Sequence, residues 1–182
     1  MQLDTERLLL REFVEKDWAR VLAYQSDPRY LRFYEWETRT SDDARAFVGM
    51  FLDWQHEQPR RRWQLAVTLR DSGLLIGNCG IRLMQAAALC AELGYELDPA
   101  YWGRGYAAEA GRAMLAFAFG ELGIHRVQAE VIAENTASAR VLEKLGFRIE
   151  GRLRENQWFK GRWWDTDLFG LIESEWRKSS DS

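Results

Sequence analysis

The chain has 182 residues, of which 47% are hydrophobic and 29% are charged, and this composition excludes an intrinsically disordered protein. The length suits one domain, so we expect residues 1–182 to form a single unit. The formal net charge of −3, from 25 basic and 28 acidic residues, excludes general electrostatic binding of nucleic acid.

The N-terminal half of the chain predicts a strand, two helices and a β-hairpin. The expected elements are a strand at Leu8–Phe13, helices at Glu15–Ser26 and from Ser41 to before Pro59, and strands at Trp63–Leu69 and Leu74–Leu83. Thr40 or Ser41 can cap the second helix, whose apolar residues recur at spacings of three and four. The segment between the helices, Pro28–Arg39, is aromatic and irregular. Alternating apolar and polar residues favour the first strand of the hairpin.

The C-terminal half predicts a crossover unit followed by two more strands. The expected elements are a strand at 92–97, a helix at about Gly105–Leu122, a strand at Ile124–Ile132, a helix at Thr136–Leu145, and strands at Phe147–Leu153 and Trp163–Leu171. If the crossover is the usual right-handed one, the first two of these strands are parallel. The whole order indicates an α+β fold, a mixed sheet with helices on both faces. We expect the tail from Arg177 to fray.

The sequence also argues against membrane insertion and secretion. No apolar run approaches the roughly 20 residues that a membrane helix needs. The N-terminal segment MQLDTERLLLREF carries charges where a signal peptide would be apolar. Cys79 and Cys90 match no metal-ligand spacing and predict no disulfide framework. We therefore expect a cytoplasmic protein with reduced thiols, no bound metal, no membrane partner and no specific nucleic-acid partner.

A glycine loop between the 92–97 strand and the next helix carries the main functional signal. The loop holds Gly103 and Gly105, and the helix opens at Tyr106–Ala107. Such an opening presents unpaired backbone N–H groups and the positive end of the helix dipole, which together suit a pyrophosphate. A second helix starts nearby at Asn135. Two helix starts in one crossover unit suggest a phosphate-bearing cofactor.

The loop has two other interpretations. Gly103, Gly105 and Ala108 fit the loose dinucleotide fingerprint GxGxxA, and Glu130 lies about where its ribose-binding acid would be. Against this, the preceding strand carries two glutamates and the segment Asp98–Trp102 intervenes before the glycines. The third interpretation is a strand-to-helix turn that binds no ligand.

Several segments together resemble one family, the GNAT acyltransferases that use acetyl-CoA. They are TERLLLREF, TSDDARAF, LGYELDPAYWGRGYAAEA, ENTASARVLEKLGF and EGRLRENQWFKGRWWDTDLFGL. The resemblance is strongest to the branch that includes the RimJ/RimL protein N-terminal acetyltransferases, and it covers nearly the whole chain. It implies a GNAT fold, in which a curved mixed sheet is splayed between the strands at 92–97 and 125–132, with acetyl-CoA in the splay.

The resemblance also implies which residues hold acetyl-CoA. The family's pyrophosphate loop has the pattern Gln/Arg-x-x-Gly-x-Gly/Ala, which falls on Trp102–Ala107, with Trp102 in place of the Gln or Arg. The expected donors are the amides of Gly103, Arg104, Gly105, Tyr106 and Ala107, with the Arg104 side chain as an added charge. Asn135 and Ser138 match the branch's Asn-x-x-Ser. Asn135 either contacts the pantetheine or acetyl region or acts only as a helix cap.

Acetyl transfer to an amine further needs a base, an oxyanion donor and a proton for the leaving thiolate. We expect Ser138 to donate to the CoA sulfur, because the tyrosine acid of many family members is absent at Val141 and Leu142. A backbone N–H among Leu93, Gly94 and Tyr95 should polarise the thioester. Glu92 is the preferred base among four carboxylates, the others being Glu96, Glu109 and Glu134. The alternative for Glu92 is a solvated carboxylate at the end of the strand. Glu109 is expected to be structural, and His56 and His125 are expected at the surface or at edges.

The acceptor pocket is expected to use aromatic residues, namely Tyr34, Trp36, Trp158 and Trp163, although any one tryptophan can instead be a core or dimer contact. We expect direct transfer in a ternary complex. The acceptor that the resemblance favours is a protein or peptide N-terminal α-amino group, as in the ribosomal-protein enzymes. The alternatives are a small amine (polyamine, amino acid or antibiotic) and a non-catalytic acyl-CoA-binding module. The branch is also compatible with a homodimer.

Overall fold

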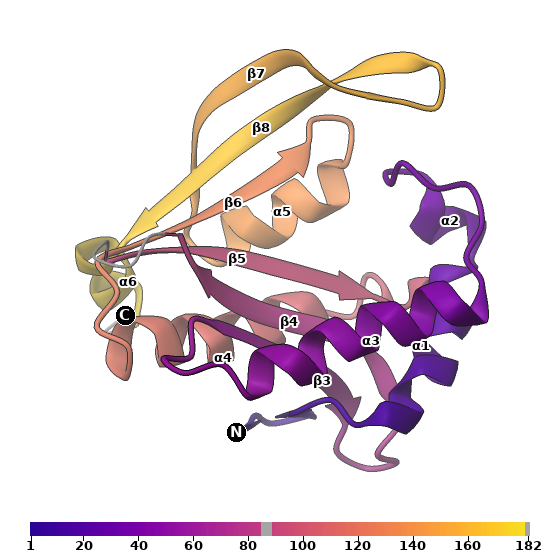
Figure 1. Ribbon diagram of the computed structural model, residues 1–182. Helices are drawn as coiled ribbons and strands as arrows, with labels where there is room; N and C mark the ends of the chain where they lie inside the picture. Colours follow the sequence, from indigo (N-terminus) through magenta and orange to yellow (C-terminus); the bar gives the residue numbers. More distant parts are fainter. Residues whose placement is uncertain (85–88, 181–182) are drawn as a thin grey trace.

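The computed structural model describes residues 1–84 and 89–180, and within them one eight-stranded sheet carries helices on both faces (Figure 1). The strands are β1 (Gln2–Asp4), β2 (Leu8–Arg11), β3 (Arg62–Leu69), β4 (Leu75–Leu83), β5 (Cys90–Leu97), β6 (Arg126–Ile132), β7 (Arg148–Phe159) and β8 (Arg162–Ile172). The helices are α1 (Trp18–Gln25), α2 (Pro28–Leu31), α3 (Ser41–Gln55), α4 (Tyr106–Gly120), α5 (Thr136–Lys144) and α6 (Glu173–Ser180), with 3-10 turns at Glu15–Asp17 and Pro99–Tyr101.

The sheet opens between its two parallel strands. Its order is β1-β2-β3-β4-β5-β6-β8-β7, and the β5–β6 pair is parallel while the other neighbours are antiparallel. Pairing between β5 and β6 covers only Cys90–Glu92 against Arg126–Gln128. Both strands continue beyond this point and diverge (Figure 1). The predicted α+β fold with a splayed mixed sheet is therefore confirmed.

Apolar side chains form a core on each face of the sheet. One core joins α1 and α3 to the sheet through residues such as Val21, Val48 and Phe51. The other places α4, with Met114 and Leu115, over the central strands. At the start of α3, Thr40 Oγ1 accepts a hydrogen bond from the Asp43 N–H (3.2 Å), and the Asp43 carboxylate accepts one from the Thr40 N–H (2.8 Å). This capping box confirms the predicted helix start.

Four elements differ from the sequence-based expectation, and one of them is β7, which runs from Arg148 to Phe159 instead of ending at Leu153. The strand β1 extends the sheet, and the short helix α2 interrupts the segment expected to be irregular. The tail expected to fray from Arg177 instead belongs to α6, which runs to Ser180. Trp176 stacks on Phe119 with ring centroids 5.8 Å apart, and this contact ties α6 to α4. Residues 181–182 of the expected tail lie outside the described part of the chain.

The β7–β8 hairpin projects from the sheet and its tip reaches the α2 region. Lys160 Nζ donates to the carbonyl oxygen of Leu31 (2.6 Å). The rings of Phe33 and Trp164 meet edge to face at 6.2 Å. The hairpin and the α1–α2 region thus come together on the side where β5 and β6 diverge (Figure 1). In the described segments, no helix has the length and apolar character needed to cross a membrane.

Candidate active site

A cleft of about 260 Å³ lies between α3, the splayed strands and the start of α5. Its walls include Glu92 to Glu96 of β5, Ala129 to Val131 of β6, and Ser138 of α5. Beyond Glu92, no strand of the described chain pairs with the edge of β5 that faces β6. Backbone N–H groups on this edge, between Leu93 and Tyr95, are therefore available to a ligand.

Arg82 is a cleft residue that the sequence reasoning missed. It pairs in register with Glu92 across β4 and β5, and its guanidinium lies so close over Gly94 that a Cβ there would overlap Nη2. Its Nε is buried and has no hydrogen-bond partner in the described structure. The signal in the sequence is a single arginine within the apolar strand Ile81-Arg82-Leu83, but its partner depends on strand register.

Glu92, the predicted base, lies at the cleft with a loose ion pair. Its Oε1 is 3.5 Å from Arg82 Nη2, and 36% of its side chain is exposed. Among the described residues it accepts no hydrogen bond, so its oxygens are free to take a proton. Its assignment as base remains a prediction.

Glu96, a second candidate base, also lines the cleft but its carboxylate is occupied. It accepts hydrogen bonds from Tyr24 Oη (2.6 Å), Gln25 Nε2 (3.0 Å), Asn78 Nδ2 (2.6 Å) and Tyr30 Oη. Burial, reinforced by the Glu96 charge, raises the pKa of Tyr24 and of Tyr30, so both phenols stay protonated as donors. The carboxylate therefore joins α1 and α2 to β5 through its hydrogen bonds.

The remaining two carboxylates are also engaged. Glu109 accepts hydrogen bonds from Thr5 and Arg7, which fits its expected structural role. Glu134 pairs with Arg162 (2.8 Å) at the surface, and this hydrogen bond holds the pKa of the Glu134 carboxyl below its ordinary value. Of the four candidates, only Glu92 combines a place in the cleft with a carboxylate that accepts no hydrogen bond from the described residues.

Ser138 contacts the side chain of Tyr95, a residue that the sequence analysis considered only for its backbone N–H. Tyr95 Oη donates to the Ser138 carbonyl oxygen (3.0 Å) and lies 2.9 Å from Ser138 Oγ. Asn135 caps α5, because its Oδ1 accepts from the Ser138 N–H (3.2 Å). Burial raises the pKa of the Tyr95 phenol well above its ordinary value, and the hydrogen bond with Ser138 offsets this rise only in part. The cleft thus holds two linked hydroxyls, although no tyrosine follows in α5.

The glycine loop has the geometry that an anion site needs. Gly103 and Gly105 have φ values of 75° and 84°, in the left-handed region that favours glycine. The first hydrogen bond of α4 runs from the Glu109 N–H to the Gly105 carbonyl oxygen (3.0 Å). The N–H groups of Gly103 to Ala107 precede it and remain open to a ligand. The loop therefore fits a pyrophosphate.

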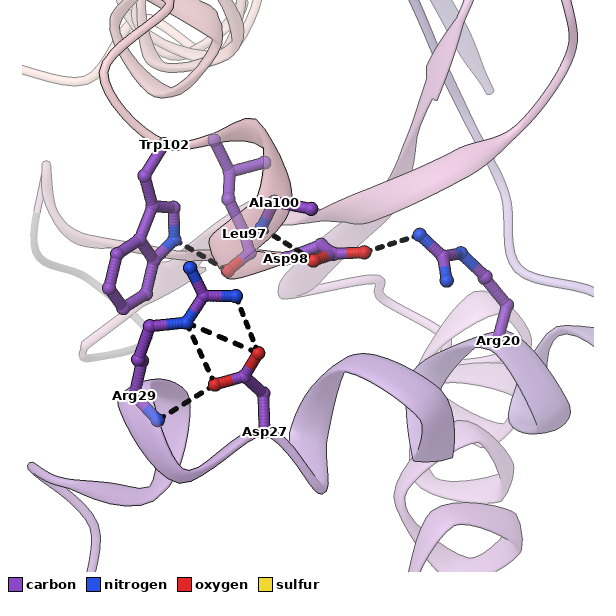
Figure 2. Close-up of polar contacts among 7 residues, drawn as sticks. All are labelled: Arg20, Asp27, Arg29, Leu97, Asp98, Ala100 and Trp102. Atoms are coloured by element: carbon purple, nitrogen blue, oxygen red, sulfur yellow. Dashed lines mark hydrogen bonds and ion pairs between the residues drawn. The ribbon is translucent and has the colours of Figure 1, made fainter.

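Trp102 anchors the loop to the strand before it, as Figure 2 shows. Its indole Nε1 donates to the Leu97 carbonyl oxygen (2.8 Å). Asp98, between them, accepts from the Ala100 N–H (2.8 Å) and pairs with Arg20 of α1. Trp102 thus has a positioning role in the place where the family pattern has Gln or Arg.

The four aromatic residues predicted for the acceptor occupy two places. Tyr34 lines the cleft and stacks on Trp36, with ring centroids 4.9 Å apart. Trp158 and Trp163 form an edge-to-face pair near the hairpin tip, with ring centroids 5.2 Å apart. They are 59% and 51% exposed and are not among the residues that line the cleft.

In the described chain, no group of three or more His, Cys, Asp or Glu side chains is arranged to hold a metal ion.

Comparison with known proteins identifies the family. The family described as Acetyltransferase (GNAT) domain matches residues 7–148. The chain belongs to the GNAT acetyltransferases. It is 35% identical to the uncharacterized N-acetyltransferase YnaD of Bacillus subtilis (strain 168), over 97% of this chain and 99% of that one. It is 24% identical to the [ribosomal protein uS5]-alanine N-acetyltransferase of Escherichia coli (strain K12), over 97% and 93% respectively.

A crystal structure agrees with these relationships. The GNAT-family acetyltransferase of Bacillus anthracis superimposes with a TM-score of 0.84 at 32% identity, covering 96% of this chain and all, 100%, of that one. The GNAT chain is thus an N-acetyltransferase that uses acetyl-CoA. The dinucleotide and binding-module interpretations are wrong. A dinucleotide fold needs a largely parallel sheet, whereas β5–β6 is the one parallel pair of this sheet among the described residues.

Proposed function

We propose that this GNAT enzyme acetylates the α-amino group of a protein or peptide, as the RimJ/RimL branch does. The observation that carries the proposal is Arg82 in the cleft, with its Nε buried and unpartnered. A guanidinium has five N–H donors and no acceptor, and the ion pair with Glu92 engages only Nη2, so a ligand oxygen can take one of the remaining donors. A peptide N-terminus carries a carbonyl oxygen beside its amine, whereas a protonated polyamine carries donors only.

The charge of the cleft favours a neutral oxygen over a carboxylate. Glu92, Glu96 and Glu130 line the cleft together with the one arginine, Arg82. This excess of negative charge would repel the α-carboxylate of a free amino acid. A peptide carbonyl avoids that repulsion, and the amine gains from the nearby carboxylates. The similarity to the uS5-alanine enzyme supports the same acceptor class.

The residues of the cleft supply the chemistry that transfer needs. Glu92, directly or through a water, takes a proton from the acceptor amine so that its lone pair can attack. A backbone N–H on the free edge of β5 donates to the oxygen that becomes negative during attack. The loop from Gly103 to Ala107 binds the pyrophosphate of acetyl-CoA, and the Ser138 hydroxyl donates to the departing sulfur. A thiolate leaves readily, since a free thiol has a pKa of roughly 8.5.

A polyamine is the second candidate acceptor. The three carboxylates of the cleft favour a polycation, and Tyr34 and Trp54 offer aromatic surfaces to an ammonium group. This candidate brings no oxygen to the Arg82 donors that the ion pair with Glu92 leaves open, which is why we rank it below the peptide.

Arg82→Met tests the choice between these acceptors. We expect kcat/KM for an alanyl tripeptide to fall by about tenfold to a hundredfold, because a hydrogen bond from a charged donor is lost. The value for spermidine should change much less, so the ratio of the two reports on the carbonyl alone. An equal loss for both acceptors, or a wild-type enzyme that prefers spermidine, would contradict the peptide proposal.

A further inference from the structure

Arg7 connects the N-terminal segment to the first turn of α4. Its Nε donates to Glu109 Oε2 (2.7 Å), and its backbone N–H donates to Glu109 Oε1 (2.8 Å). Thr5 Oγ1 donates to the same Oε1 (2.6 Å). Residues from before β2 therefore surround one carboxylate of the helix that follows the glycine loop.

The same guanidinium also holds the glycine loop itself. Arg7 Nη1 donates to the Arg104 carbonyl oxygen (3.0 Å). Its Cζ lies 4.6 Å from the centre of the Tyr106 ring, and a Cβ on Gly105 would lie 3.4 Å from Nη2. Arg7 thus contacts Arg104 and Tyr106, the residues on either side of Gly105, from outside the cleft.

This contact sets the direction of a backbone donor. The peptide between Arg104 and Gly105 is planar and trans, so its C=O and N–H point in opposite directions. Because Arg7 holds the Arg104 carbonyl, the Gly105 N–H is turned away from Arg7. Gly105 in its left-handed conformation (φ 84°) then begins α4.

We propose that Arg7, fixed by Glu109, is a positioning residue that orients the loop amides for the pyrophosphate of CoA. The inference rests on the pyrophosphate role assigned to this loop. It explains the opening Thr5-Glu6-Arg7, which no step of acetyl transfer uses directly. The Glu109 carboxylate, with four donors at 2.6 to 2.8 Å, is fully engaged in holding Arg7.

Arg7→Met tests the inference against a closely matched control, Arg60→Met. Arg60 likewise pairs with a carboxylate (Glu12, 2.7 Å), donates to a backbone carbonyl (Arg62, 3.0 Å) and faces an aromatic ring (Trp63, 5.7 Å). The first readout is the Kd of CoA by calorimetry on the full chain. We expect it to rise at least about tenfold in Arg7→Met and by less than about twofold in Arg60→Met.

The second readout separates loop positioning from general destabilisation. S-acetylpantetheine donates an acetyl group but has no pyrophosphate. We expect Arg7→Met to lower kcat/KM for acetyl-CoA by about tenfold and to leave kcat/KM for S-acetylpantetheine within about twofold of wild type. Glu109→Gln provides the same comparison if Arg7→Met does not fold.

Two results would overturn the inference. One is an unchanged Kd for CoA in Arg7→Met, and the other is an equal loss with both donors. If wild-type protein itself fails to bind CoA, the pyrophosphate role of the loop falls first, and the positioning role falls with it.

Discussion

Glu92 and Glu96 lie on the same face of β5, yet their surroundings give them different chemistry. Glu96 accepts from four side chains, whereas Glu92 has one loose ion pair. We expect Glu92→Gln to lower kcat/KM by about a hundredfold, the range of general-base catalysis, without changing the Kd of CoA. The control is Glu134→Gln, at an exposed carboxylate outside the cleft, which should retain activity. A Glu92→Gln enzyme with wild-type turnover would exclude this base.

Ser138 and Tyr95 should act as a unit because their hydroxyls are 2.9 Å apart. Ser138→Ala removes the group proposed to face the sulfur, and we expect kcat to fall by about tenfold or more. Tyr95→Phe leaves Ser138 without its hydrogen-bond partner and should lower kcat less. Steady-state kinetics of the double variant should show a loss smaller than the product of the two single losses, since the residues are coupled. Independent losses would mean that Tyr95 only packs.

At the scale of elements, the start of α4 depends on glycine at its N-cap. Gly105 has φ 84°, and Gly105→Ala would place a side chain in the left-handed region at a cost of about 1–2 kcal/mol. We expect lower stability in denaturant unfolding together with weaker CoA binding. Gly49 is the control, since it lies inside α3 with open space around it. Gly49→Ala should stabilise the protein by about 0.5–1 kcal/mol. Gly105→Ala with unchanged stability and CoA affinity would contradict this role.

The contact between α4 and the N-terminal segment should depend on pH. Burial raises the pKa of Glu109, but hydrogen bonds from Thr5 and Arg7 outweigh it and place the pKa below the ordinary 4.5. Because the pKa of Glu109 is lower in the folded state than in the unfolded state, the ionised carboxylate stabilises the fold at pH values above its ordinary pKa. This stabilisation is lost as the pH falls through the folded-state pKa. The difference in unfolding free energy between wild type and Glu109→Gln should therefore be largest near neutral pH and shrink in acid. A difference that grows in acid would contradict this assignment.

Local sequence signals predicted most elements and failed where long-range contacts decide. The capping box at Thr40 acts within a few residues, so the start of α3 was predictable. The tail was predicted to fray because the sequence does not reveal that Trp176, just before it, stacks on Phe119, which lies far away in the chain. The strand β1 is only three residues long, Gln2–Asp4, too short for a periodic signal.

At the scale of the whole molecule, the cleft exists because the parallel strands β5 and β6 pair only at their beginnings and then diverge. The splay and the pyrophosphate loop followed from the family resemblance and the crossover pattern. The positions of Arg82 over Gly94 and of Tyr95 against Ser138 depend on how β4, β5 and α5 are placed together. The sequence does not show which residues of different elements are in contact, and Arg82 was missed for this reason.

The central claim is that this cleft transfers an acetyl group to a peptide α-amine, and mass spectrometry tests it most directly. The protein is incubated with acetyl-CoA, a lysine-free peptide with a free N-terminus, an N-terminally blocked peptide containing lysine, and spermidine. We predict one added acetyl group on the first peptide, located at its α-nitrogen by fragmentation, with little on the others. Acetylation of spermidine or of the lysine side chain, with the free α-amine unmodified, would contradict the account.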